Sequence, residues 1–108
     1  MISRRVLAVD FAQFSDEDPS LKGRLIDLMI DNLIELEQGY YLSARSGDAS
    51  FLLKTYHKVT TTLKMLQDKE LDAVVEDLKD PDLGPAAISH YKRIKAEITS
   101  SLLAEKSC

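Results

Sequence analysis

The stretch FLLKTYHKVTTTLKML, residues 51–66, decides the fold. Its large apolar side chains recur in alternating steps of four and three positions, which is the spacing of one face of an α-helix. These residues are Leu52, Tyr56, Val59, Leu63 and Leu66. Polar and basic residues fill most of the other positions. The stretch therefore predicts an amphipathic helix that packs by one face against neighbouring helices.

A longer helix is predicted ahead of this stretch. Asp18 is a suitable N-cap, and Pro19 fits the first turn, where its missing N–H costs no hydrogen bond. Ser46-Gly47-Asp48 ends the helix, because glycine is typical of the position after a helix, and Asp48 is free to cap the next one. The expected apolar positions are Leu21, Leu25, Leu28, Met29, Leu33, Leu36 and Tyr40. Gly39 is a weak point inside this helix.

Two more helices are predicted after residue 66. A short break at Gln67-Asp68 precedes a third helix, and the residues from Asp80 to Pro85 are so rich in helix breakers that they predict a loop. The apolar face of the third helix comprises Leu71, Val74, Val75 and Leu78. That of the fourth comprises Ile88, Tyr91, Ile94, Ile98 and Leu102.

These elements predict an all-α protein of one domain. About four amphipathic helices joined by short connections favour an antiparallel up-down four-helix bundle over about residues 18–105. Residues 1–17 are expected to add a short N-terminal helix or a cap over the bundle. Because one chain already supplies about four helices, we expect a monomer.

Composition narrows the possible functions. The chain has 108 residues, 44% of them hydrophobic and 30% charged, which is the balance of a globular protein. A net charge of −4 argues against nucleic acid as a partner. The lone cysteine, Cys108, cannot form an internal disulfide, and no segment resembles a signal peptide or a membrane span. We therefore expect a cytoplasmic protein without a membrane partner.

One histidine stands out on the central helix. His57 follows Tyr56 by one residue, which places it about 100° around the helix at the edge of the apolar stripe, within reach of solvent. Neutral imidazole is a competent nucleophile near pH 7. The candidate groups to stabilise a phosphoryl group on His57, or to dock its donor, are Lys54, Lys58, Thr60, Thr61 and Lys64.

The chain resembles the histidine-containing phosphotransfer (HPt) family of two-component phosphorelays. The resemblance spans about Phe11 to Leu102 and rests on the long acidic helix that ends in Ser-Gly-Asp, on residues 51–66, and on LDAVVEDL at 71–78. It implies that His57 is the phospho-acceptor and that the partners are response-regulator receiver domains or hybrid histidine kinases. A receiver would dock over the first two bundle helices and carry the Mg²⁺. The chain itself would bind no cofactor and would have neither a kinase ATP-binding domain nor autonomous catalysis.

Two departures from the family pattern keep a second hypothesis open. Thr60 and Thr61 stand where the family usually has lysine and then glycine or serine. A transfer-incompetent module that binds a receiver or kinase as adaptor or inhibitor is therefore the main alternative. A weaker resemblance links residues 57–63 to the histidine box of sensor-kinase dimerisation helices, although Lys58 replaces its acidic residue. A purely structural adaptor is the third alternative.

The remaining candidates have less support. His90 lies beside Arg93 and Glu97 on the fourth helix and is expected to be an ordinary solvated residue. Two histidines on different helices do not establish a metal site, so no metal ligand is assigned.

Overall fold

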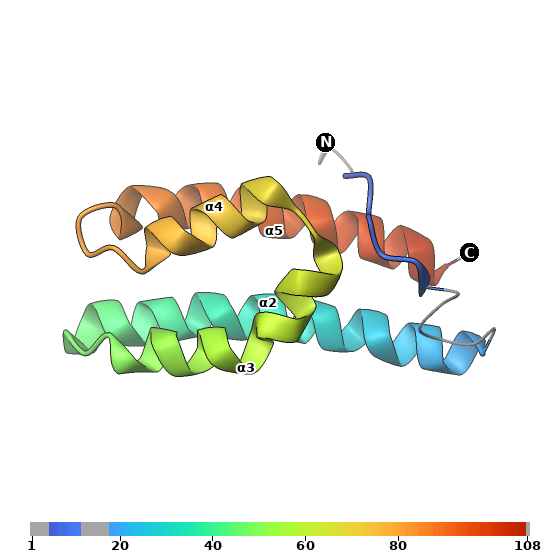
Figure 1. Ribbon diagram of the computed structural model, residues 1–108, viewed down its shortest axis with the longest axis horizontal. Helices are drawn as coiled ribbons and strands as arrows, with labels where there is room; N and C mark the ends of the chain where they lie inside the picture. The colour runs from blue at the N-terminus through green and yellow to red at the C-terminus, as the bar shows by residue number, and fades with distance from the viewer. Residues whose placement is uncertain (1–4, 12–17, 108) are drawn as a thin grey trace.

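The computed structural model describes residues 5–11 and 18–107, and within these ranges it contains four helices and no strand. The helices are α2 (Pro19–Ser46), α3 (Ser50–Leu66), α4 (Lys69–Leu78) and α5 (Gly84–Lys106). Consecutive helices run antiparallel, so that α2 and α3 form one hairpin and α4 and α5 form a second hairpin over it (Figure 1). The predicted up-down four-helix bundle is confirmed.

Local side-chain and backbone chemistry sets both ends of α2. The Asp18 carboxylate accepts a hydrogen bond from Ser20 N at 2.9 Å, as an N-cap should. At the other end, Gly47 adopts the left-handed conformation with φ 71°, and its N–H donates to the Ser43 carbonyl. Glycine adopts this conformation without the steric cost that a Cβ brings. Both predicted ends of α2 are therefore confirmed.

The predicted start of α3 needs a correction. Asp48 accepts a hydrogen bond from Ser50 N, but the N-cap position belongs to Ala49, whose side chain cannot cap. Another free N–H of the first turn, that of Leu52, donates to Ser43 Oγ at 2.8 Å. The Ser43 side chain of the preceding helix thus does part of the capping and ties α2 to the first turn of α3.

The connections between α3 and α4 and between α4 and α5 lie where the sequence predicts helix breaks. Gln67 ends α3 in the left-handed conformation with φ 49°, and Asp68 caps α4 by accepting from Leu71 N at 2.9 Å. The predicted loop from Asp80 to Pro85 is too long at its C-terminal end. Gly84 and Pro85 belong to the first turn of α5, where proline loses no helical hydrogen bond.

The core lies between the two hairpins. From α3 it takes Leu52, Val59, Leu63 and Leu66, whereas Tyr56 is only half-buried; every predicted apolar residue of α4 and α5 is buried. In α2 the prediction is partly wrong, because Leu21 and Leu28 are 42% and 54% exposed. The buried apolar side chains of α2 are those of Ile26, Met29, Leu33, Leu36 and Tyr40. Apolar residues occur on more than one side of this helix, and periodicity alone selects the wrong side for two of them.

Hydrogen bonds inside the core fix how α2 meets its neighbours. Asn32 Nδ2 donates to Thr62 Oγ1 at 2.7 Å, and both side chains are buried. Tyr91 of α5 is fully buried, and its hydroxyl donates to the Leu33 carbonyl. Burial raises the pKa of the Tyr91 hydroxyl, so the group remains a donor at physiological pH. Buried polar groups of this kind are stable only when paired, and they set the helix register.

The described part of the predicted N-terminal cap packs beside α5. Arg5 N donates to Ser101 Oγ at 2.7 Å, and the Ser101 hydroxyl donates back to the Arg5 carbonyl at the same distance. Phe11 is 6% exposed and belongs to the core. Residues 5–10 are neither helix nor strand. The rest of the predicted segment, residues 1–4 and 12–17, lies outside the described residues.

The Arg5 guanidinium ties this segment to both helices of the second hairpin. It pairs with Asp68 at 3.2 Å, with Glu70, and with Glu97 at 2.9 Å. A hydrogen bond from Arg5 is the largest cause that lowers the pKa of Glu70 to about 2, and a hydrogen bond from His90 is the next. The segment is therefore held by charge as well as by the burial of Phe11.

Candidate functional site

His57 lies near the middle of α3 and its side chain is exposed. The ring of the preceding residue, Tyr56, packs edge-on against it, with centroids 6.0 Å apart and an angle of 60° between the planes. Tyr56 is half-buried at the margin of the core. One turn of a packed helix therefore holds the imidazole on the surface, as the helical offset from the apolar stripe predicts.

The three predicted lysines differ in what they contact. Lys58 pairs with Glu35 of α2 at 2.9 Å. Lys54 and Lys64 are exposed, and neither forms a salt bridge in the part of the chain that the structure describes. The pKa of Asp48 is lowered mainly by hydrogen bonds from Ser50, and the charge of Lys54 adds to this. Of the predicted cations, Lys54 and Lys64 are therefore the ones available to an anion on the face of His57.

The three consecutive threonines of α3, residues 60–62, have three different environments. The hydroxyl of Thr60 donates to the Tyr56 carbonyl four residues earlier at 2.7 Å. Thr62 is buried and accepts the hydrogen bond from Asn32. Thr61 is exposed, one helical turn after His57. Thr60 has already donated its proton and Thr62 is buried, so among these three threonines Thr61 is the exposed one whose hydroxyl the described residues do not engage.

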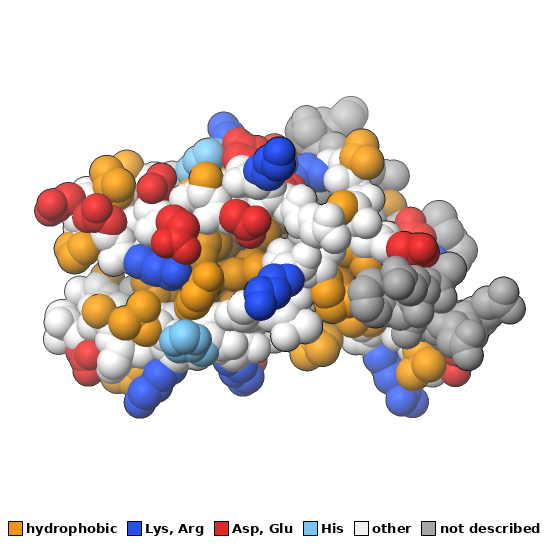
Figure 2. Space-filling model, viewed as in Figure 1, with side chains coloured by type: hydrophobic (Ala, Val, Ile, Leu, Met, Phe, Trp, Pro, Cys, Tyr) orange, Lys and Arg blue, Asp and Glu red, His pale blue; other side chains and the backbone are white. Residues whose placement is uncertain are grey.

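A groove between α3 and α4 lies on the same side of α3 as His57. It has a volume of about 190 Å³ and is lined by Tyr56, Thr60, Leu63 and Lys64 from α3 and by Asp72, Val75 and Glu76 from α4. Thr60 and Lys64 lie three and seven residues after His57 and therefore share its helix face. Figure 2 shows hydrophobic side chains between the two helical layers, with basic and acidic side chains close by.

The α4 wall of this groove is acidic. Burial is the largest cause that raises the pKa of the Asp72 carboxyl, followed by the negative charges of Asp68 and Glu76. Lys79 offsets part of this charge, because its ammonium lies 2.8 Å from Glu76 Oε1 and 3.4 Å from the centroid of the Tyr56 ring. His57 therefore has basic neighbours on its own helix, α3, whereas the helix across the groove, α4, is partly acidic.

Sequence reasoning missed the neighbours that belong to other elements. Lys79 follows α4 and stacks on the ring beside His57, while Asp72 and Glu76 face the groove. Helical spacing within residues 51–66 carries no information about these three. For Asp72 and Glu76, the sequence shows only that they lie four residues apart on the predicted third helix and so share one of its faces. It gives no indication of the position of Lys79.

His90 is better anchored than predicted. Its side chain is partly exposed, as predicted, but its Nε2 lies 2.8 Å from Glu70 Oε2. Arg93 is 3.7 Å from the same carboxylate. His90 belongs to the ion cluster around Arg5, and nothing in its contacts suggests a nucleophile.

Chemically, the surface around His57 suits the reversible transfer of an anionic group. It offers a ring nitrogen in solvent, two cations on one helix face and one free hydroxyl. Among residues 5–11 and 18–107, no three His, Cys, Asp or Glu side chains gather as a metal site would require. None of the described helices is both long and apolar enough to cross a bilayer.

Comparisons with protein-family models, with curated proteins and with solved structures found no match to this chain.

Proposed function

We propose that this chain is a phosphorelay intermediate that accepts a phosphoryl group on His57 and passes it to or from response-regulator receiver domains in the cytoplasm. The observation that carries the proposal is the exposed His57 ring at the middle of a packed helix, with Lys54 and Lys64 on the same helix. The resemblance of residues 51–66 and 71–78 to the HPt family supports it.

The proposed transfer needs little machinery from this chain. The lone pair of an unprotonated ring nitrogen of His57 attacks phosphorus. The phosphorus–oxygen bond to the receiver aspartate breaks, and its electron pair stays on that carboxylate. Mg²⁺ would belong to the receiver, where it neutralises the phosphoryl oxygens. This chain holds the ring in place and stabilises the transferred charge through Lys54, Lys64 and Thr61.

The geometry favours a docking surface centred on α3 that extends toward α4. His57 shares its helix face with Thr60 and Lys64, which line the groove to α4, whereas Lys58 points to α2 and pairs with Glu35. A receiver that covers His57 therefore meets the groove wall as well as α3. This differs from the expectation that it docks over the first two bundle helices, α2 and α3.

Phosphotransfer with matched histidine variants tests the proposal. Receiver domains from the same genome are phosphorylated with labelled acetyl phosphate, and acid-labile label on the chain is followed in time. We expect label on the wild type, none on His57→Gln, and wild-type label on His90→Gln, the control that removes the other histidine. Label that persists in His57→Gln, or that depends on His90, contradicts the proposal.

A second candidate function is a module that binds a receiver or kinase without transfer. It is favoured by Thr60, whose hydroxyl donates to the Tyr56 carbonyl and which lacks the charge of lysine, and by Lys58, which is paired with Glu35. Saturable binding to a receiver without transfer of label would support this candidate and exclude the relay. In that case Thr60→Lys is expected to leave the chain unlabelled if the histidine is only a contact residue, and to restore labelling if the missing charge is the defect.

A further inference from the structure

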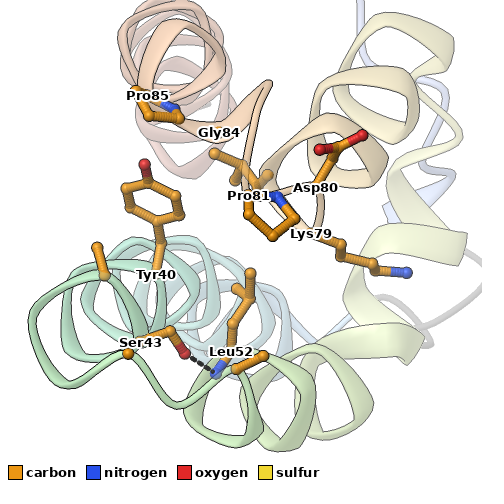
Figure 3. A pocket seen from close by; sticks show the side chains of 12 residues that line it. Tyr40, Ser43, Leu52, Lys79, Asp80, Pro81, Gly84 and Pro85 are labelled. Atoms are coloured by element: carbon orange, nitrogen blue, oxygen red, sulfur yellow. Dashed lines mark hydrogen bonds between the residues drawn. The ribbon is translucent and has the colours of Figure 1, made fainter.

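A pocket lies at the end of the bundle where the α2–α3 turn meets the α4–α5 loop, apart from the groove beside His57. Its volume is about 330 Å³, within the range of small-molecule sites. At about 30 Å³ per water, that volume equals roughly eleven waters, or one compact ligand. Tyr40, Leu52 and Pro81 border it, with Gly84 and Pro85 from the start of α5 (Figure 3).

One polar group of this pocket lacks a protein partner. Tyr40 is 8% exposed, and among the described residues nothing donates to or accepts from its hydroxyl. Its ring packs on the backbone of α5 so closely that a Cβ added at Gly84 would lie 3.0 Å from the ring and 3.2 Å from the hydroxyl oxygen. The hydroxyl oxygen itself keeps some solvent access, so a molecule in the pocket can reach it. An acceptor supplied by a ligand would satisfy it.

The charged residues at the pocket are committed elsewhere. Lys79 directs its ammonium to Glu76 and to the Tyr56 ring, and the Asp80 carboxylate accepts from Asp82 N at 2.8 Å. Figure 3 shows both side chains pointing away from Tyr40 and Leu52. Ser43 Oγ is occupied by the N–H of Leu52. The interior therefore offers no free charge, and a charged ligand would lose its hydration without compensation.

We propose that this pocket binds a compact, uncharged aromatic molecule carrying one hydrogen-bond acceptor. The flat faces of Tyr40, Pro81 and Pro85 suit a planar ring, and the Tyr40 hydroxyl donates to the acceptor. Because its walls come from both hairpins, the ligand holds α2 and α3 against α4 and α5 at this end of the bundle. This site is independent of the proposed phosphotransfer on His57.

Three probes of similar size test the proposal by amide chemical shifts in ¹⁵N–¹H spectra: acetophenone, which carries an acceptor; toluene, which carries none; and benzoate, which is charged. We expect saturable shifts at the amides of Gly47 and Gly84 with acetophenone, weaker binding of toluene, and at least tenfold weaker binding of benzoate. The absence of saturable acetophenone binding, shifts confined to other regions, or benzoate binding as tightly as acetophenone would overturn the proposal.

Three variants locate the ligand and its hydrogen bond. Tyr40→Phe keeps the ring, and we expect it to weaken acetophenone binding about 2- to 12-fold, the value of one hydrogen bond, while leaving toluene binding unchanged. An equal loss for both probes would overturn the role of the hydroxyl. Ala44→Leu adds bulk at the rim from an exposed position and should abolish binding of both probes. Ala73→Leu, exposed on α4 and away from the pocket, is its matched control, and equal affinities in the two leucine variants would place the ligand elsewhere.

Discussion

Replacing Gly39 by alanine tests how closely α2 and α3 approach. In an unconstrained helix this change stabilises by about 1 kcal/mol, because alanine loses less backbone entropy on folding. Here the added Cβ would lie 2.6 Å from Thr55 Oγ1 and 3.0 Å from Thr55 Cβ. Rotation of the threonine would break its hydrogen bond to the Phe51 carbonyl, so relief by that route also costs free energy.

The expected magnitude follows from these opposing effects. Forcing an extra methyl into a packed contact costs about 1–3 kcal/mol, against the gain in helix propensity of about 1 kcal/mol. Gly39→Ala should therefore lower the free energy of unfolding by about 0–2 kcal/mol. In the Thr55→Ala background the 2.6 Å contact with Oγ1 no longer exists, although the 3.0 Å contact with the Cβ of residue 55 remains, so the same change should be about 1 kcal/mol less harmful.

Urea denaturation followed by helical circular dichroism measures these differences. Gly23→Ala is the matched control in the same helix, because its Cβ would meet only Lys106 Cε at 3.8 Å. It should stabilise by about 1 kcal/mol. If Gly39→Ala stabilises as much as Gly23→Ala, and does so equally with and without Thr55, the close contact between α2 and α3 is refuted.

Three other predictions concern stability. Thr62→Val leaves the Asn32 amide buried without its acceptor and should cost about 1–3 kcal/mol in urea denaturation; a loss below 0.5 kcal/mol would mean that the amide finds another partner. Gln67→Gly removes a side chain from φ 49° and should raise the melting temperature, by an amount equivalent to about 0.5–1 kcal/mol; a lower melting temperature would contradict that reason. The pKa of Glu70 is lowered from 4.5 to about 2, first by the hydrogen bond from Arg5, so its contribution is complete above pH 4.5 and is lost as the pH falls toward 2. Stability should therefore fall less steeply over that window in Glu70→Gln than in wild type, and parallel curves would show that the pairing contributes nothing.

The fold could be predicted from the sequence where one signal dominates. The alternation of steps in residues 51–66 marks one apolar face, and four of its five predicted positions are buried, with Tyr56 at the margin. Gly47 and Asp68 mark helix ends that local backbone and capping chemistry sets. In α2, however, Leu28 and Met29 are adjacent and equally apolar. Only the position of the other helices decides that Met29 is buried and Leu28 exposed. Which of two adjacent apolar residues is buried depends on tertiary packing, and the periodicity of one segment does not reveal it.

Gly39 also has a role that depends on a neighbouring helix. From the sequence it is a helix-weakening residue, because propensity is the only property visible within one segment. In the bundle it is the position at which α3 approaches α2, with Thr55 against its backbone. The apparent defect is a packing requirement, and no pattern within either helix reveals which residue of the partner lies opposite.

In the candidate site, the exposure of His57 depends on its own helix, whereas the groups available around it depend on the neighbouring helices. Exposure of His57 follows from its offset from the apolar stripe of its own helix. The availability of the surrounding groups does not, because Lys58 is engaged by Glu35 of α2 and the α4 wall contributes Asp72 and Glu76. A phosphoryl group on His57 would gain from Lys64 and lose to these two acids. Burial, followed by the charges of Asp68 and Glu76, already raises the pKa of Asp72, and a phosphoryl group nearby would raise it further. For the two proposed functions, phosphoryl relay and docking without transfer, the charge of α4 therefore matters as much as Thr60 and Thr61.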